Sequence, residues 1–186
     1  KARTYHSGVS DDLDAVITEL HKHHPDKNLI VVAYSLGANV LLKWLGEVGN
    51  QSIVSKAVAV STPFTLHLCS QAMLSGFSRI YGRYFTKRLL RGLKNKIAHF
   101  KNQDDGEQLE PLLALGDITT ISSIWEFDER VTAPLHGFSG AVDYYSQCSS
   151  IGFLPAIETK TLLIQSSDDP MIPTPALPGA EHLSPA

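Results

Sequence analysis

The stretch Leu29-Ile30-Val31-Val32-Ala33-Tyr34-Ser35-Leu36-Gly37 decides the fold of this chain. Its first five residues form an unbroken apolar run of strand length, which is typical of a parallel-sheet strand buried on both faces. The rest matches the nucleophile-elbow motif G-x-S-x-G, with Ala33 in the place of the first glycine. In that motif the serine lies on a strained strand-to-helix turn, and small residues flank it because neighbouring backbone passes close by. Ser35 is therefore the candidate nucleophile, although an ordinary strand-to-helix turn of a Rossmann-like sheet can carry the same pattern.

A helix is predicted immediately after the elbow, over residues 39–45. Its N-terminus would direct a positive dipole end and free N–H groups towards the serine. The backbone N–H of Leu36 is then one donor of an oxyanion hole, the site that stabilises negative charge on the substrate oxygen.

A second helix is predicted before the elbow, where apolar residues recur at helical spacing. Ser10 is in the N-cap position, and acidic residues follow it in the first turn. Leu13, Val16, Ile17 and Leu20 follow at i, i+3, i+4 and i+7, which predicts that they form one buried face.

Two further apolar runs predict buried strands at residues 56–61 and 161–165. Strands that alternate with helices at short spacing indicate βαβ units. We therefore expect an α/β fold, with a mainly parallel sheet and helices on both of its faces. Together with the elbow motif at Ser35, this favours the α/β-hydrolase fold. Three strands are few for such a sheet, and the chain does not begin with Met. We expect a fragment that lacks N-terminal strands.

The chain is predicted to form one structural domain with an insertion. Residues 1–64 form the hydrolase core with the elbow, residues 65–158 a helical cap insertion, and residues 159–186 the last core strand with its acid turn. Within the insertion we expect helices at residues 81–93, 117–125 and 138–148, and a polar loop at residues 101–106.

The turn after the third predicted strand carries two candidate acids, Asp168 and Asp169. An acid at this place orients the catalytic histidine in α/β-hydrolases, whose triads run in the chain order Ser, Asp, His. Asp169, which precedes Pro170, is the preferred acid and Asp168 the alternative. A plain Asp-Pro turn is the competing interpretation.

The general base is expected beyond residue 186. His182 is the only histidine after Asp169, and it follows by just 13 residues. That spacing leaves no room for the helix and strand that should precede the base, so His182 is interpreted as a surface histidine. His6 and His136 come in the wrong chain order for a triad, and structural roles are expected for both.

Composition excludes several other classes of protein. The net charge of −3 provides no general basic field for nucleic acid. The basic segment 81–96 is expected to be a solvated helix face, with peripheral membrane contact as the alternative. Cys69 and Cys148 lack the spacing of a metal site or a disulfide framework. We interpret them as reduced thiols of a cytoplasmic protein, with no metal and no cofactor.

Several stretches together resemble the YheT-like α/β-hydrolases, which include bacterial proteins and the similar eukaryotic ABHD esterases. The matching stretches are residues 3–8, 34–39, 61–64, 76–79, 127–128, 132–138, 143–145 and 168–170. The resemblance implies a serine esterase that acts on carboxylic esters or acylglycerols without a metal or cofactor. It carries over Ser35 as nucleophile, Asp169 as acid and the insertion as a helical cap. The family's histidine lies in a Gly-Gly-His stretch that would come after residue 186.

Two alternatives to ester hydrolysis stay open. A non-catalytic hydrolase scaffold would bind a lipid or a protein partner through aromatic side chains of the cap. Residues of this kind are Phe77, Tyr81, Tyr84 and Phe85. An acyltransferase would use the same nucleophile with an acceptor other than water.

Overall fold

The computed structural model describes residues 1–185, which form two compact units. The sheet unit comprises Ser7–Cys69 and the chain from Gln147 onward. The helical unit comprises Lys1–His6 and Ser70–Ser146. The first six residues thus belong with the helical unit, although the segment that follows them belongs with the sheet.

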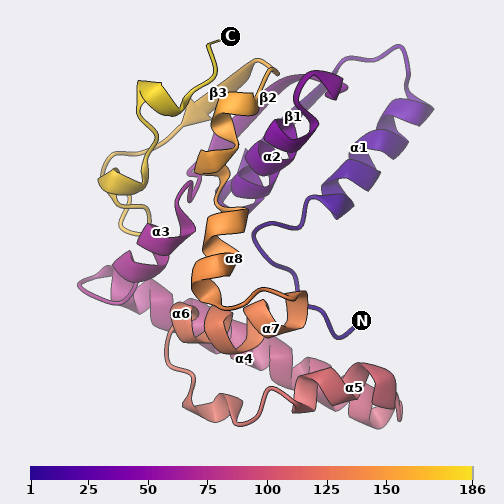
Figure 1. Ribbon diagram of the computed structural model, residues 1–186, viewed down its shortest axis with the longest axis vertical. Coiled ribbons are helices and arrows are strands. Elements are labelled where there is room, and N and C mark those ends of the chain that lie inside the picture. The colour runs from indigo at the N-terminus through magenta and orange to yellow at the C-terminus, as the bar shows by residue number, and fades with distance from the viewer. Residues whose placement is uncertain (186) are drawn as a thin grey trace. The chain divides into compact units, whose positions relative to one another are not determined.

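A three-stranded parallel sheet is the centre of the sheet unit (Figure 1). Its strands are β1 (Leu29–Tyr34), β2 (Val54–Val60) and β3 (Thr161–Ile164), in the spatial order β1-β2-β3. Val31 pairs with Ala57, which in turn pairs with Thr161. All three predicted strands are confirmed, and their carboxyl ends lie at the same edge because the strands are parallel.

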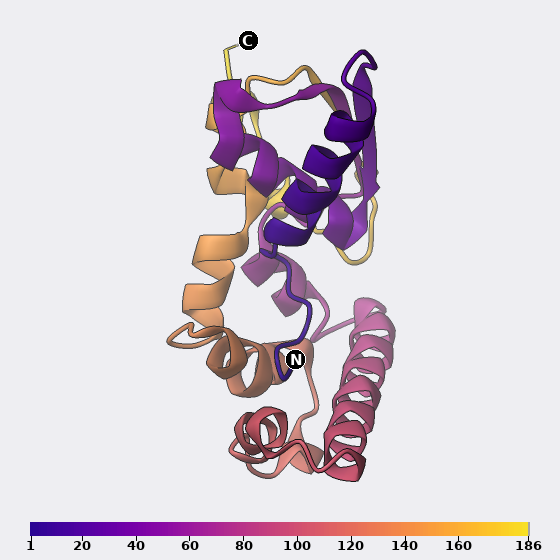
Figure 2. The same ribbon diagram turned by 90° about the vertical axis from the view of Figure 1, so that its right-hand side faces the viewer.

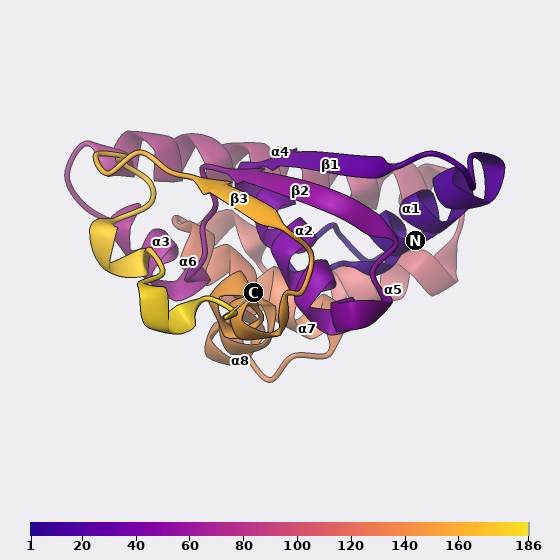
Figure 3. The same ribbon diagram turned by 90° about the horizontal axis from the view of Figure 1, so that it is seen from above.

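Helices α1 (Asp11–His23) and α2 (Ser35–Val48) cover one face of this sheet (Figure 3). Strand residues such as Val31 and Ala59 pack there against fully buried leucines of α2. These leucines are Leu41, Leu42 and Leu45. The sheet and α2 therefore share one hydrophobic core.

The opposite face of the sheet is open to solvent among the described residues. Ile30, Val32 and Tyr34 of β1 are 61%, 51% and 65% exposed, and Leu162 and Ile164 of β3 are also exposed. The prediction that these strands are buried on both faces is therefore wrong for residues 1–185. An apolar run identifies a strand, but helices cover only one of the two faces onto which its side chains alternate.

Helix α1 differs from its prediction in two respects. Ser10 occupies the N-cap position, but its side chain makes no cap hydrogen bond and its Oγ donates to Glu47 instead (2.7 Å). Ile17 is buried as expected, whereas Val16 and Leu20 are 57% and 46% exposed. The buried face is narrower than predicted because α1 packs mainly against α2, where Trp44 Nε1 donates to Asp14 (2.9 Å).

Short elements complete the sheet unit around its core. Helix α3 spans Leu66–Ala72 and leads from the sheet unit into the helical unit. The remaining elements are single 3₁₀ turns: η1 (Gly49–Gln51), η4 (Ser150–Gly152), η5 (Leu154–Ala156), η6 (Thr174–Ala176) and η7 (Ala180–His182).

The helical unit contains a 25-residue helix, α4 (Ser78–Asn102), which packs beside α5 (Gly106–Leu113) (Figure 2). Its core joins Leu93 and Phe100 of α4 to Leu112 of α5 and to Phe127 and Val131. The other elements are η2 (Ile118–Thr120), α6 (Ile124–Phe127), the π-helical turn η3 (Asp128–Thr132), α7 (Ala133–His136) and α8 (Ala141–Cys148).

Predictions for this region are confirmed in part. The helix predicted at residues 81–93 is part of α4, and the helix predicted at residues 138–148 contains α8, which begins three residues later than predicted. The prediction of one helix over residues 117–125 is wrong, because two separate short elements, η2 and α6, form there. The Asp117 carboxylate caps η2 by accepting from Thr119 N (2.9 Å), and the Ser123 hydroxyl caps α6. The loop predicted at residues 101–106 is shorter, since α4 continues to Asn102.

No helix within residues 1–185 is long and apolar enough to cross a membrane.

Candidate active site

Ser35 lies at the turn between β1 and α2, with a left-handed backbone conformation (φ +50°). A non-glycine residue in this region is strained, and such strain is concentrated at functional sites. The side chain is exposed at the carboxyl edge of the sheet. This is the geometry of a nucleophile elbow, in which the serine hydroxyl stands clear of the sheet.

The N-terminus of α2 begins at this serine. Tyr34 occupies the N-cap position and makes no side-chain cap hydrogen bond. The first backbone N–H groups of a helix have no partner within the helix, so the N–H of Leu36 is placed to donate to an anionic oxygen near Ser35. The 14-residue length of α2 adds a positive dipole end at the same place.

One expected feature of the elbow is absent from these residues. A Cβ built on Gly37 would meet no atom within 4 Å, so no neighbouring backbone crowds this position in residues 1–185. The prediction that small flanking residues avoid close backbone is therefore wrong for Gly37 here. Its surroundings are open because Ser35, Leu36 and Gly37 are all exposed.

The two candidate acids follow β3 and have different surroundings. Asp169 is half-buried, and its Oδ1 accepts from Met171 N (2.8 Å). Burial, and then the charge of Asp169, raise the pKa of the Cys69 thiol to about 12. Asp168 is exposed and accepts from Ser166 Oγ within its own turn. Asp169 therefore faces the interior of the sheet unit, whereas Asp168 faces solvent.

Strand order brings Ser35 and the acid turn to one edge. Ser35 ends β1, the acid turn follows β3, and β2 lies between them. Neighbouring strands are about 4.8 Å apart, so the two strand ends are separated by roughly 10 Å. A third side chain, such as an imidazole, is needed to connect a serine and a carboxylate across that gap.

Ser61 at the end of β2 is a feature that the sequence analysis missed. It also adopts a left-handed conformation (φ +52°), and its N–H donates to Ile164 O (2.9 Å). Ser61 therefore lies between the elbow and the acid turn at the same sheet edge. No G-x-S-x-G pattern surrounds it, and no other local signal in the sequence indicates its conformation.

The histidines considered from the sequence have other partners. His182 Nδ1 accepts from Gly179 N (3.1 Å) within its own turn and lies 3.2 Å from Glu181 Oε1. His6 and His136 belong to the helical unit, where their ring centroids are 4.3 Å apart. Burial, and then the charge of Arg3, lower the pKa of His136. The 41% exposed side chain of His182 is consistent with a surface histidine, and the ring contact of His6 with His136 is consistent with structural roles for these two.

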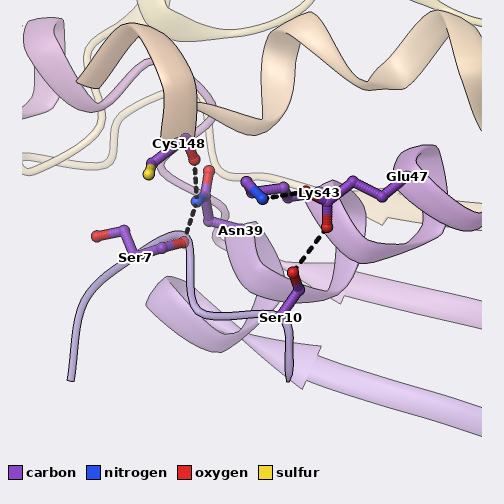
Figure 4. A network of polar contacts seen from close by, with 6 residues as sticks. All are labelled: Ser7, Ser10, Asn39, Lys43, Glu47 and Cys148. Carbon is purple, nitrogen blue, oxygen red and sulfur yellow. Dashed lines mark hydrogen bonds and ion pairs between the residues drawn. The ribbon is translucent and has the colours of Figure 1, made fainter. Parts of the chain in front are cut away.

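Asn39 is a second residue whose role the sequence analysis missed. Its amide Nδ2 donates to Ser7 O (2.9 Å) and Cys148 O (2.8 Å) (Figure 4). Its Oδ1 accepts from Ser150 N (2.9 Å). Asn39 is fully buried one turn after Ser35. It therefore fixes the start of α2, and with it the elbow, to two distant segments of the sheet unit.

Cys69 and Cys148 are both buried, and neither forms a disulfide bond. Within residues 1–185, no group of three or more His, Cys, Asp or Glu side chains has the arrangement of a metal site. The groups at the carboxyl edge of the sheet include the Ser35 hydroxyl, the Asp169 carboxylate and the first N–H groups of α2.

A family model described as the alpha/beta hydrolase fold matches residues 1–186. The chain belongs to the α/β-hydrolase family. This establishes the predicted fold class.

Curated relatives of this hydrolase chain are named as lipid- and ester-processing enzymes. YheT of Escherichia coli, which is named as an esterase, is 36% identical over 183 residues, covering 98% of the chain and 52% of YheT. Monoacylglycerol lipase of Saccharomyces cerevisiae is 28% identical (90% of the chain, 37% of the lipase). Human phospholipase ABHD3 is 27% identical (95% of the chain, 41% of the phospholipase). The chain thus spans about half the length of YheT and less of the other two. No solved structure gives a significant match.

Proposed function

We propose that the protein is a serine hydrolase that cleaves carboxylic esters, with acylglycerols or similar lipids as its substrate class. The observation that carries this proposal is the left-handed Ser35 at the N-terminus of α2. Its relatives named esterase, monoacylglycerol lipase and phospholipase support the substrate class.

In the proposed mechanism, Ser35 Oγ attacks the ester carbonyl and forms an acyl-enzyme after the alcohol leaves. The Leu36 N–H donates to the oxyanion. Asp169 orients the histidine that takes the serine proton and later passes it to the leaving alcohol. We place this histidine outside residues 1–186, in the part of the relatives' length that the chain does not span. A water molecule then hydrolyses the acyl-enzyme.

We further propose that residues 65–158 form the cap of this hydrolase. Residues 70–146, between β2 and β3 in the sequence, form a compact unit with its own hydrophobic core, which supports an inserted module.

We also propose a cytoplasmic location. Cys69 and Cys148, which are not in a disulfide, support it, because reduced cysteines are typical of that compartment.

Labelling of the full-length protein with a fluorophosphonate probe tests the nucleophile. The serine oxygen would bond to phosphorus with loss of fluoride, so labelling reports an activated hydroxyl. We expect the Ser35→Ala variant to lose labelling completely. Ser61→Ala is the matched control, because Ser61 is a left-handed serine at the same sheet edge, and it should keep labelling.

The outcome also separates the competing functions. Absence of labelling in the folded protein, or labelling that persists in Ser35→Ala, contradicts the proposal and favours a non-catalytic scaffold. Labelling that depends on Ser35, followed by transfer of the acyl group to an added alcohol faster than to water, would identify an acyltransferase.

The acid is tested by a matched pair of variants with a chromogenic ester as substrate. We expect Asp169→Asn to lower kcat on the order of 10³-fold or more, because the histidine loses its orienting carboxylate. Asp168→Asn should change kcat little, since Asp168 faces solvent. The reverse result would move the role of acid to Asp168.

A further inference from the structure

Helix α4 concentrates the positive charge of the chain. Eight of the sixteen Lys and Arg residues lie between Ser78 and Asn102, and this segment contains no Asp or Glu. The rest of the chain contains the other eight basic residues and all nineteen acidic residues, so its net charge is −11. An acidic protein therefore carries one strongly basic helix.

The first half of α4 also exposes a row of large apolar side chains. Phe77, Ile80 and Tyr84 are 67%, 61% and 54% exposed. Their spacing of three and four residues places them on one face of the helix. The Phe77 ring lies edge-on to Tyr81 (5.8 Å between centroids), and Leu74, just before the helix, is also exposed. A surface helix normally turns such residues to the core.

This apolar row is separate from the face that α4 buries. Gly82, Thr86 and Leu93 are buried, and a Cβ on Gly82 would lie 2.4 Å from Met73 O. The close packing at Gly82 fixes the rotation of α4 within the helical unit. The apolar row is consequently held outward, and a small rotation of the helix would not bury it.

Basic side chains flank the apolar row. Arg79, Arg83 and Lys87 are exposed and repeat every four residues along a neighbouring face. Arg88 donates to the Tyr84 hydroxyl (3.2 Å), and its guanidinium lies 5.8 Å from the Tyr84 ring centroid. Lys96 is excluded from this surface because it donates to the backbone carbonyls of Lys1 and Arg3.

A cavity of about 170 Å³ opens beside this basic face. Arg79 and Arg83 line it together with Ser70, Ser122 and Ser123. The Glu126 carboxylate already accepts from the N–H and hydroxyl of Ser122 (2.7 and 3.0 Å). Two guanidinium groups at a polar cavity are suited to a phosphate group, which they bind through paired N–H donors.

We propose that residues 77–89, which comprise the N-cap residue Phe77 and the first half of α4, dock the protein on an anionic lipid surface. Phe77, Ile80 and Tyr84 insert among the acyl chains, while Arg79 and Arg83 bind the phosphates of lipid headgroups. A helix with an apolar face and basic flanks lies in the plane of the interface. A polyanion such as a nucleic acid would use the arginines but would not require the exposed aliphatic Ile80. The proposal is independent of the catalytic role of Ser35.

Vesicle sedimentation with the full-length protein tests this docking. The vesicles are phosphatidylcholine alone, or phosphatidylcholine mixed with phosphatidylglycerol. We expect binding to the anionic vesicles and much weaker binding to the neutral ones. Arg79→Gln with Arg83→Gln should weaken anionic binding on the order of tenfold or more, because each basic residue near such a surface contributes about fivefold. Phe77→Ser with Ile80→Ser should weaken it by at least about tenfold through lost insertion.

Matched controls come from exposed residues elsewhere. Leu113→Ser with Val142→Ser removes two apolar side chains of the helical unit that are 59% and 65% exposed, and it should leave binding unchanged. Lys22→Gln with Lys27→Gln removes two exposed charges of the sheet unit and should also leave it unchanged. Unchanged thermal unfolding would show that each variant is folded.

Insertion has its own readout in the Phe77→Trp variant. Its fluorescence should shift to the blue with anionic vesicles, relative to the parent protein with Trp44 and Trp125. Failure to bind anionic vesicles, or binding that the α4 variants leave intact, overturns the proposal. So does binding that heparin competes away and that depends on the arginines but not on Phe77 and Ile80, which would indicate a polyanion partner.

Discussion

Each compact unit contains a buried polar side chain that binds more than one partner, Asn39 in the sheet unit and Asp128 in the helical unit. The two side chains differ in their chemistry and in how far their partners lie from them in the sequence. In the sheet unit, the Asn39 amide binds three backbone groups that lie 32 to 111 residues away in the sequence, two of which, Ser7 O and Cys148 O, are seen in Figure 4. In the helical unit, the Asp128 carboxylate accepts from the hydroxyls of Thr132 and Tyr145 (both 2.7 Å), four and seventeen residues away. Asn39 is thus a neutral group that connects distant parts of the sequence. Asp128 is an ionisable group whose partners lie nearer in the sequence.

The difference indicates which unit responds to pH. The Asn39 amide does not titrate in the pH range in which proteins fold, so its hydrogen bonds persist at any pH at which the sheet unit is folded. Burial raises the pKa of Asp128 to about 6, although the hydrogen bonds from Thr132 and Tyr145 lower it. Its charged form is therefore costly in the folded state, and the helical unit should become less stable as Asp128 ionises.

The largest effect on stability is expected when the Asn39 side chain is removed. Asn39→Ala removes the hydrogen bonds to Ser7 O, Cys148 O and Ser150 N, and each such bond contributes about 0.5–1.5 kcal/mol to stability. We expect the free energy of unfolding to fall by about 3 kcal/mol, measured by urea denaturation. Asn50→Ala, at an exposed position just after α2, is the control and should change it by less than about 0.5 kcal/mol. Similar small losses in both variants would show that Asn39 does not hold the sheet unit together.

The second effect is the pH dependence of the contribution that Asp128 makes to stability. The pKa of Asp128 is higher in the folded state than its ordinary value of 3.8, so the folded protein binds this proton more tightly. The contribution of Asp128 is thus fully present below about pH 4 and is lost as pH rises through about 6. The change amounts to about 2–3 kcal/mol.

The Asp128→Asn variant isolates this contribution, because an amide does not titrate. We expect the stability of the parent protein relative to this variant to decrease by about 2 kcal/mol between pH 4 and pH 7. Urea denaturation at a series of pH values measures it. Parallel curves for the two proteins would contradict the raised pKa.

The smallest effect concerns the hydroxyl that binds the carboxylate. Tyr145 Oη donates to Asp128 and lies 3.2 Å from Ser70 Oγ. Tyr145→Phe should cost about 2 kcal/mol at pH 7.5, where the acceptor is charged, and about 1 kcal/mol at pH 4.5, where it is protonated. Tyr84→Phe, at an exposed position of the same unit, should cost less than about 0.5 kcal/mol at either pH. A cost for Tyr145→Phe that is the same at both pH values would mean that Asp128 does not change its charge in this range.

The same contrast explains how far the sequence predicts the candidate site. The elbow at Ser35 and the acid turn at Asp169 were predicted, because each is a local pattern attached to an apolar strand. The partners of Asn39 could not be predicted, since they are backbone groups of residues 7, 148 and 150, and backbone groups have no sequence signature. The left-handed conformation of Ser61 has no local motif either.

The sequence by itself determined the three strands, the turn at Ser35 and the basic composition of α4, because apolar runs, motif spacing and charge are properties of neighbouring residues. Only the tertiary structure decided which side chains of a strand are covered. Val31 and Val32 are the same residue type, yet Val31 packs against α2 and Val32 is half exposed, because α1 and α2 lie on one side of the sheet. The exposure of Phe77, Ile80 and Tyr84 was decided in the same way. Close packing at Gly82 fixes the rotation of α4, and no apolar spacing in the sequence specifies that rotation.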